Sequence, residues 1–169
     1  YNILKNGNEE QKKKYIPPLV SGEKLGCFAI TEPNAGSDVL AMRSKAVPAG
    51  GNFVLNGTKT WISFANVADI AIVYAYTDTS VKKSKGMSAF VVEMDSPGVS
   101  TVVMDKIGTH SFPTGEIIFE DVKVPKENLL GNLGDGVRIV FGSLPDTRLG
   151  VAAGAVGLAQ ICLDKSIEY

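Results

Sequence analysis

Apolar and polar positions along the chain predict helices at both ends and short strands between them. Residues 8–20 are expected to form a helix, because Asn8 is a suitable N-cap and two glutamates follow it in the first turn. The Ser21-Gly22 pair that follows is typical of a helix end.

From residue 25 the pattern becomes that of strands separated by turns such as Ala49-Gly50-Gly51-Asn52. Asn56-Gly57, between Val54-Leu55 and Trp61-Ile62, is typical of a tight hairpin turn. Strands at roughly 10-residue spacing with no helix between them predict a sandwich or barrel, and no Gly-rich strand–turn–helix unit supports a Rossmann domain. The expected strands are 25–31, 42–48, 52–62, 68–77, 86–94, 99–104 and 116–124.

After Val124-Pro125 the pattern returns to helix, beyond a glycine-rich link at residues 131–136. Residues 137–144 and 146–169 are expected to be helical, with Pro145 kinking or separating them. Glycine in a helix interior costs about 1 kcal/mol relative to alanine, so a helix rich in small residues predicts close packing in a bundle or an oligomer interface. The small residues are Gly150, Ala152, Ala153, Gly154, Ala155, Gly157 and Ala159.

Composition and charge exclude several classes of protein. The net charge of −1 over 169 residues gives no electrostatic case for nucleic acid or a membrane surface. No apolar run approaches the roughly 18 residues of a membrane-spanning helix. One histidine and no Cys/His cluster exclude a histidine-based zinc site, so no metal is expected.

Cysteine usage and the chain ends indicate a piece of an intracellular protein. Cys27 and Cys162 lie far apart in different predicted elements, which favours two small buried thiols over a disulfide. The absence of an expected disulfide in turn favours a reducing compartment over secretion. The chain starts at Tyr1 without an initiating Met or a signal peptide and stops inside a helical pattern, so an excerpt of a longer protein is expected.

Residues 27–38 carry the strongest candidate chemistry. A half-buried strand is followed by Glu32-Pro33, which favours extended backbone, and then by Asn34 and Gly36, which tolerate positive φ. This strand end would present backbone N–H groups and hydroxyls to a flat cofactor along the strand and an anionic group at the turn. The two hydroxyls are those of Thr31 and Ser37.

Four segments in the same order resemble the acyl-CoA dehydrogenase family and cover nearly the whole chain. They are residues 28–38, 55–63, 119–131 and 148–160. The resemblance implies a mixed α and β fold: an antiparallel β barrel or sandwich middle domain flanked by segments of N- and C-terminal helical domains. The implied boundaries are residues 1–22, 23–130 and 131–169.

The resemblance also implies FAD as cofactor and an acyl-CoA thioester as substrate. In this family a carboxylate removes the α-proton while the β-hydrogen leaves as hydride to flavin N5. The implied partners are an electron-transfer flavoprotein and three further copies in a homotetramer. The implied compartment is the bacterial cytoplasm or the mitochondrial matrix.

By similarity, the cofactor-binding residues come from three places in the chain. Two of them, Phe28 and Ile30, would form a wall for the isoalloxazine ring, and Ser63 would lie near N5 where threonine is usual. The full set is Phe28, Ala29, Ile30, Thr31, Gly36, Ser37, Trp61, Ile62 and Ser63.

The substrate-binding residues expected by similarity are Ser37, Ser84, Asp146, Thr147 and Arg148. Three departures from the family pattern accompany them. Pro145 stands where Asp is frequent, with Asp146 next to it. Thr147 occupies a position where some members carry the catalytic base, and His110 stands where arginine is common. Threonine cannot serve as that base, so no catalytic residue is assigned within the chain. The base is expected to be a Glu beyond Tyr169, or an Asp or Glu from elsewhere in the full protein.

The sequence is also compatible with other functions on the same scaffold. A non-catalytic binding or assembly relative need not keep the ring-facing set, so retention of Phe28, Thr31, Trp61 and Ser63 argues against it. A flavin oxidase or a decarboxylating dehydrogenase would share all these residues. The fragment alone is expected to be inactive.

Overall fold

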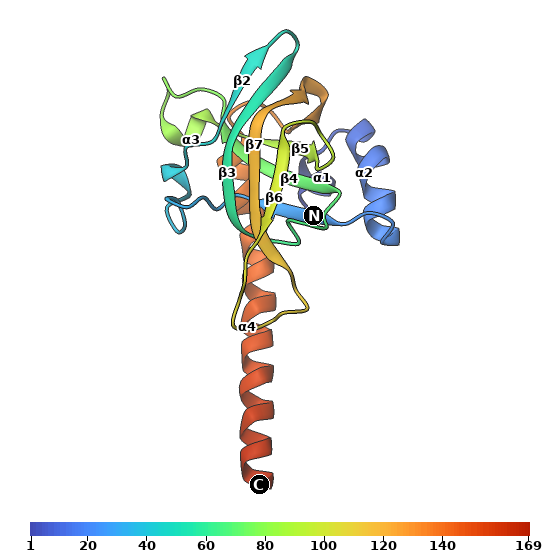
Figure 1. The fold of residues 1–169 in the computed structure, drawn as a ribbon, viewed down its shortest axis with the longest axis vertical. Helices are drawn as coiled ribbons and strands as arrows, with labels where there is room; N and C mark the ends of the chain where they lie inside the picture. Colours follow the sequence, from blue (N-terminus) through green and yellow to red (C-terminus); the bar gives the residue numbers. More distant parts are fainter.

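The computed structural model describes residues 1–169, apart from the side chain of Asp146. Figure 1 shows a body of strands flanked by short helices, from which one long helix projects. The N-terminal helices are α1 (Asn2–Asn6) and α2 (Glu9–Ser21), and the projecting helix is α4 (Gly136–Glu168).

Eight strands form one sheet in the order β6-β7-β3-β2-β4-β5-β8, with β1 paired to β4 beside that path. Most pairings are antiparallel, whereas β1–β4 and β2–β4 are parallel. The strands are β1 (Gly26–Ala29), β2 (Lys45–Ala49), β3 (Asn52–Ser63), β4 (Ile70–Tyr76), β5 (Met87–Glu93), β6 (Val99–Val103), β7 (Thr114–Pro125) and β8 (Leu129–Leu130). Three short helical turns connect them: η1 (Val39–Ala41), α3 (Lys83–Gly86) and η2 (Lys126–Asn128).

The mixed fold class is confirmed, and all seven predicted strands are present with ends shifted by a few residues. Strand β4 is buried along its whole length because its two faces belong to different cores. Ala71, Val73 and Ala75 join the core between the strands. The alternate residues, such as Ile72 and Tyr74, join a second core that includes residues of α1, α2 and α4.

The predicted N-terminal helix is confirmed, and its cap also ties it to the sheet. The Asn8 side chain accepts a hydrogen bond from the Gln11 backbone at 2.8 Å, and the Gln11 side chain accepts one from the Asn8 backbone at 3.1 Å. The Gln11 amide also donates to the carbonyls of Glu127 and Leu129, at 2.7 and 2.8 Å. Gly22 ends the helix in the left-handed conformation, with φ of 78°.

The hairpin predicted at Asn56-Gly57 is wrong. Both residues lie inside β3, at a register irregularity where Leu55 pairs with Val122 but Gly57 pairs with Phe119. The irregularity places one extra residue in β7, and the Asn56 amide donates to the Asp121 carboxylate at 3.0 Å across it. The actual β2–β3 hairpin turns at Gly50 and Gly51, whose φ values are 56° and 84°.

The turn after β1 differs from its predicted geometry. Asn34 and Gly36 do not have positive φ. The turn is closed instead by two backbone hydrogen bonds of 3.0 Å between Glu32 and Ala35. Pro33 is the second residue of this four-residue turn. A turn with proline at that position can close without a residue of positive φ.

Pro145 does not divide the C-terminal helix, because α4 is continuous through it. The side chains of α4 are exposed from Thr147 onward, including Cys162, so the prediction that Cys162 is buried is wrong for this chain. By length and hydropathy α4 is the one described helix that could cross a membrane, a test that core helices of soluble proteins also pass. Burial of its small residues against further helices stays a prediction.

Gly57→Ala is expected to destabilise the protein by about 2 kcal/mol or more. Gly57 has φ of 145°, and an added Cβ would collide with the side chain of Ser44. Gly108→Ala is the matched control, since no atom lies within 4 Å of the added methyl group. Urea denaturation of the two variants and the parent protein measures the difference, and equal stabilities for both variants would contradict the strain at Gly57.

Candidate functional site

A β-bulge in β3 turns the Trp61 side chain outward. Lys59 pairs with Ile117 and Ile62 pairs with Gly115, so β3 contains one more residue than β7 over this interval. Trp61 takes up the irregularity with φ of 57°, and 59% of its surface is exposed. Bulges are frequent where a strand must re-aim a side chain next to a site.

The bulge lies beside the end of β1. The Thr60 backbone donates a hydrogen bond of 2.9 Å to the Thr31 carbonyl, which joins the two segments. In the part of the chain that the structure describes, no hydrogen bond engages the hydroxyls of Thr31, Ser37 or Ser63. An exposed indole face close to the free hydroxyls of Thr31 and Ser63 fits a flat, polar-edged cofactor such as a flavin.

The predicted cofactor-binding residues differ in what they can offer. Phe28 and Ile30 are half-buried, and the Phe28 ring packs against Tyr74 at 5.2 Å between centroids. Ala29 and Ile62 have buried side chains, so their predicted roles rest on backbone atoms. Gly36 and Ser37 are exposed in the turn beyond.

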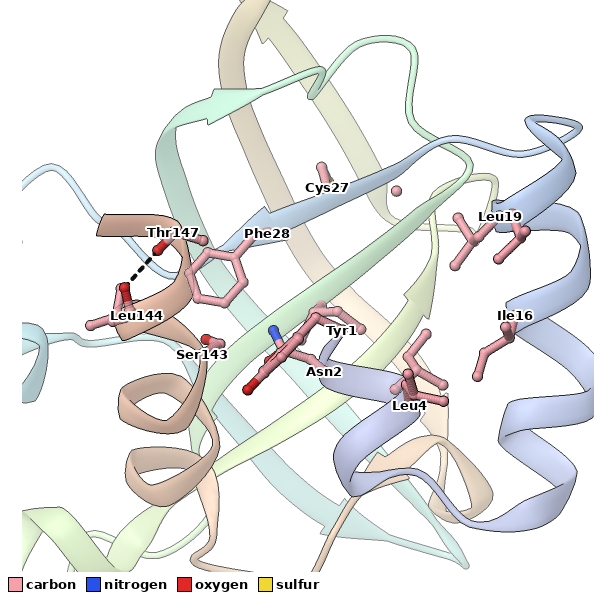
Figure 2. Close-up of a pocket in the computed structure, with 14 residues that line it drawn as sticks. Tyr1, Asn2, Leu4, Ile16, Leu19, Cys27, Phe28, Ser143, Leu144 and Thr147 are labelled. Atoms are coloured by element: carbon pink, nitrogen blue, oxygen red, sulfur yellow. Dashed lines mark hydrogen bonds between the residues drawn. The ribbon is translucent and has the colours of Figure 1, made fainter. Parts of the chain in front are cut away.

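A cavity of about 780 Å³ opens between α1, α2, β1, β4 and α4. Figure 2 shows the Phe28 ring among residues of α4, including Thr147, whose hydroxyl donates to the Leu144 carbonyl at 2.9 Å. The structure thus brings a residue predicted to face the cofactor and one predicted to face the substrate to the same cavity. Its lining is mostly apolar: Tyr1, Asn2, Ile3, Leu4, Ile16, Leu19, Val20, Gly26, Cys27, Phe28, Ile72, Ser143, Leu144 and Thr147.

The contribution of the N-terminal helices to this cavity was not foreseen. Ile16, Leu19 and Val20 are spaced to lie on one face of α2, and this apolar face of an otherwise charged helix was the available signal. Cys27 also lines the cavity, and burial raises the pKa of its thiol to about 12. The thiol is therefore protonated at neutral pH and acts as a small apolar group.

Ser37 and Ser84 belong to a different part of the molecule, at the C-terminal end of β4. Tyr76 at that end donates from its hydroxyl to the Leu40 carbonyl at 2.9 Å, which holds the segment after Ser37. The Thr77 backbone donates to the Gly86 carbonyl at 2.9 Å, which holds the short helix containing Ser84. Arg148 is exposed on α4, and Asp146 lies outside the described side chains.

A buried ion pair, which no sequence pattern predicts, joins the end of β1 to the bulge. The Lys59 ammonium lies 2.8 Å from Glu32 Oε1, with side chains only 0% and 6% exposed. Glu32 Oε1 also accepts from the Ser44 hydroxyl at 2.5 Å and backbone at 3.0 Å, while Oε2 accepts from the Arg43 backbone at 2.6 Å. The alternation of apolar residues in β3 gives no reason to expect a buried lysine.

Burial alone would raise the pKa of the Glu32 carboxyl, but the Lys59 charge and the hydrogen bonds outweigh burial and lower it. Burial lowers the pKa of the Lys59 ammonium, and the Glu32 charge opposes that shift. The lowered pKa keeps the Glu32 carboxyl ionised at neutral pH, and the Lys59 ammonium at 2.8 Å is the partner of its charge.

The middle domain of the acyl-CoA dehydrogenases matches residues 27–122 as a family model. This chain belongs to the acyl-CoA dehydrogenase family. It is 58% identical to a glutaryl-CoA dehydrogenase from Desulfococcus multivorans, over 100% of this chain and 43% of that protein. It is 48% identical to the mitochondrial isovaleryl-CoA dehydrogenase of Pongo abelii, over 99% of this chain and 40% of that protein.

Solved acyl-CoA dehydrogenase structures share the fold. A glutaryl-coenzyme A dehydrogenase in complex with glutaryl-CoA matches with a TM-score of 0.96 and 58% identity, over 100% of this chain and 43% of that one. Butyryl-CoA dehydrogenase from Megasphaera elsdenii matches with a TM-score of 0.94 and 44% identity, over 99% of this chain and 44% of that one. The predicted family is confirmed, and the chain spans about two-fifths of the length of these relatives. The predicted domain boundaries and site residues stay predictions.

Glu32→Gln is expected to cost about 3 kcal/mol or more near neutral pH, because it leaves Lys59 charged and buried without a counter-ion. The lowered pKa of Glu32 means that its stabilising contribution is present above about pH 4.3, the ordinary value, and is lost as the pH falls through the folded value. The difference in unfolding free energy between parent and variant should therefore narrow as the pH falls below about 4.3. Urea denaturation across a pH series measures it.

Glu10→Gln is the control, since the Glu10–Lys13 pair is exposed and should matter little at any pH. A gap for Glu32→Gln that stays constant down to pH 3 would contradict the charged state of the pair.

Proposed function

We propose that the protein containing this chain is an FAD-dependent acyl-CoA dehydrogenase that converts an acyl-CoA thioester to its α,β-unsaturated product. One observation carries this proposal: β1, with its predicted flavin-facing Phe28, and α4, with its predicted substrate-facing Thr147, form walls of a single apolar cavity. An apolar cavity with few polar groups suits an acyl chain beside a flat ring.

In the reaction the substrate loses an α-proton and a β-hydrogen, and a carbon–carbon double bond forms between those atoms. FAD, when bound, supplies the acceptor for the β-hydrogen, which leaves as hydride with both bonding electrons. The α-proton goes to a carboxylate that we place beyond Tyr169, because Thr147, directly before Arg148, cannot take it.

The residues of this chain bind and orient the two reactants. Phe28 and Ile30 would form an apolar wall for the ring, while the hydroxyls of Thr31 and Ser63 would donate to its polar edge. Trp61, turned outward by the bulge, would cover the ring and exclude water from it.

The substrate's CoA arm and the phosphates would lie along the polar ends of the strands. Ser37 in the turn after β1 suits a phosphate-bearing chain, and Ser84 on α3 is held at the same end of β4. Arg148 and Asp146 on α4 would contact the CoA arm, with the guanidinium of Arg148 suited to phosphate-like acceptors.

We infer the partners and the compartment from family membership. The electrons would pass from the reduced cofactor to an electron-transfer flavoprotein, and the protein would assemble as a homotetramer. The exposed apolar side chains of α4, such as Leu149, Val156 and Ile161, would then be covered by further helices of the whole protein. The compartment would be the bacterial cytoplasm or the mitochondrial matrix, and the relatives include a protein from Desulfococcus multivorans and a mitochondrial one.

The test uses the whole protein reconstituted with FAD and titrated without oxygen with glutaryl-CoA, isovaleryl-CoA and butyryl-CoA. Bleaching of the flavin absorbance by one of these thioesters is the expected result. Hydrogen peroxide formation in air would indicate an oxidase, and release of CO₂ from glutaryl-CoA would indicate a decarboxylating dehydrogenase. A folded protein that binds no flavin would contradict the proposal and favour a non-catalytic relative.

Ser63→Ala is expected to slow flavin reduction about tenfold, since a hydrogen bond to the reacting edge contributes about 1.4 kcal/mol. Ser63→Thr keeps the hydroxyl and should retain the parent rate within a factor of about three. Ser100→Ala on the exposed face of β6 is the matched control and should change nothing. Stopped-flow absorbance measures the rates, and equal rates for Ser63→Ala and Ser63→Thr would remove Ser63 from the site.

A further inference from the structure

We propose that the Glu32–Lys59 ion pair is a positioning device, which sets the spacing between the two backbone segments that flank the cofactor. The inference rests on the proposed function, because it assigns the pair a role in holding FAD. Neither side chain is exposed enough to touch the cofactor directly. Both act through the backbone that they hold.

The two charged residues lie next to the segments predicted to face the cofactor. Glu32 directly follows Ile30 and Thr31, and Lys59 comes two residues before Trp61. The segments 28–31 and 61–63 are the two that carry the predicted ring-facing residues. The ion pair therefore links them at the place where each leaves regular strand geometry.

Strand β3 holds the end of β1 through two hydrogen bonds. The Lys59 ammonium donates to the Ile30 carbonyl at 3.3 Å, and the Thr60 backbone donates to the Thr31 carbonyl at 2.9 Å. Two consecutive carbonyls are thus directed toward β3. The hydroxyl of Thr31 is left without a partner among the described residues and available to a ligand.

Glu32 is itself held in place by several hydrogen bonds. Its carboxylate accepts hydrogen bonds from Lys59, from the Ser44 hydroxyl and from the backbones of Arg43 and Ser44. These donors come from β3 and from the segment that enters β2. The carboxylate therefore connects its own turn to two other parts of the chain. A carboxylate with this many partners cannot shift without losing several of them.

The energetics of a buried ion pair favour a role in geometry over a role in stability. A buried ion pair contributes little to net stability, because the cost of removing both charges from water offsets their attraction. An apolar pair of similar size would serve the fold equally well. Geometry at the cofactor is what such a pair can add, since hydrogen bonds to a charged group define direction as well as distance.

The experiment uses the whole protein with the double variant Glu32→Gln/Lys59→Met, which removes both charges together and leaves no lone buried charge. The melting temperature of the FAD-free protein is expected to stay within a few degrees of the parent. The dissociation constant for FAD, measured by titrating the FAD-free protein, is expected to rise at least about tenfold. The visible absorption bands of the remaining bound flavin should shift, which a loss of fold stability alone would not produce.

The matched control is Lys14→Met/Glu93→Gln. That pair has the same chemistry and an N–O distance of 2.6 Å, but Lys14 is exposed, Glu93 is only half-buried, and the pair joins α2 to β5. FAD affinity is expected to be unchanged in it. FAD affinity within twofold of the parent in a folded Glu32→Gln/Lys59→Met protein would overturn the positioning role.

Ser44→Ala decides the matter if the double variant does not fold. It removes one donor to Glu32 and keeps both charges, so the protein should fold and bind FAD about two- to fivefold more weakly. Unchanged affinity in this variant would overturn the proposal. If the parent protein itself binds no FAD, the proposed function fails, and that result is distinct from a parent that binds FAD and variants that bind it equally well.

Discussion

A single buried carboxylate organises the middle of this molecule. Glu32 takes hydrogen bonds from β3 and from the entry to β2, and its charge is balanced by a lysine that is fully buried. The closed turn from Glu32 to Ala35, the end of β1 and the bulge at Trp61 are all within three residues of one member of the pair. A shift of this carboxylate would therefore move both segments that carry the predicted ring-facing residues, 28–31 and 61–63.

Room for this arrangement comes from Gly57. Its missing side chain leaves space for Ser44, which in turn donates to Glu32. The irregularity in β3–β7 pairing at Gly57 and the bulge at Trp61 lie on either side of Lys59. The long strand β3 thus departs from regular pairing on both sides of the lysine that holds the end of β1, and such bulges re-aim side chains next to a site.

The sequence predicted the elements well because their signals are local. The cap at Asn8, the stop at Gly22 and the seven strands all follow from residues close together in the chain. The hairpin at Asn56-Gly57 failed because the same dipeptide also suits a bulge, and only pairing with β7 distinguishes the two. The cavity and the Glu32–Lys59 pair depend on contacts between distant residues, so no local pattern reveals them. The predicted site residues themselves came from family resemblance, and the structure brings only some of them together.

Strand β4 shows how side-chain size can fix the register of a strand in this sheet. Both of its faces are apolar, so alternation of hydrophobic and polar residues cannot fix its alignment with its neighbours. Side-chain size does so instead: one face carries alanines and a valine, and the other carries isoleucines and two tyrosines. A slip by one residue would force tyrosine rings into space shaped for methyl groups. The volume of side chains, rather than their polarity, encodes the register on which both cores are built.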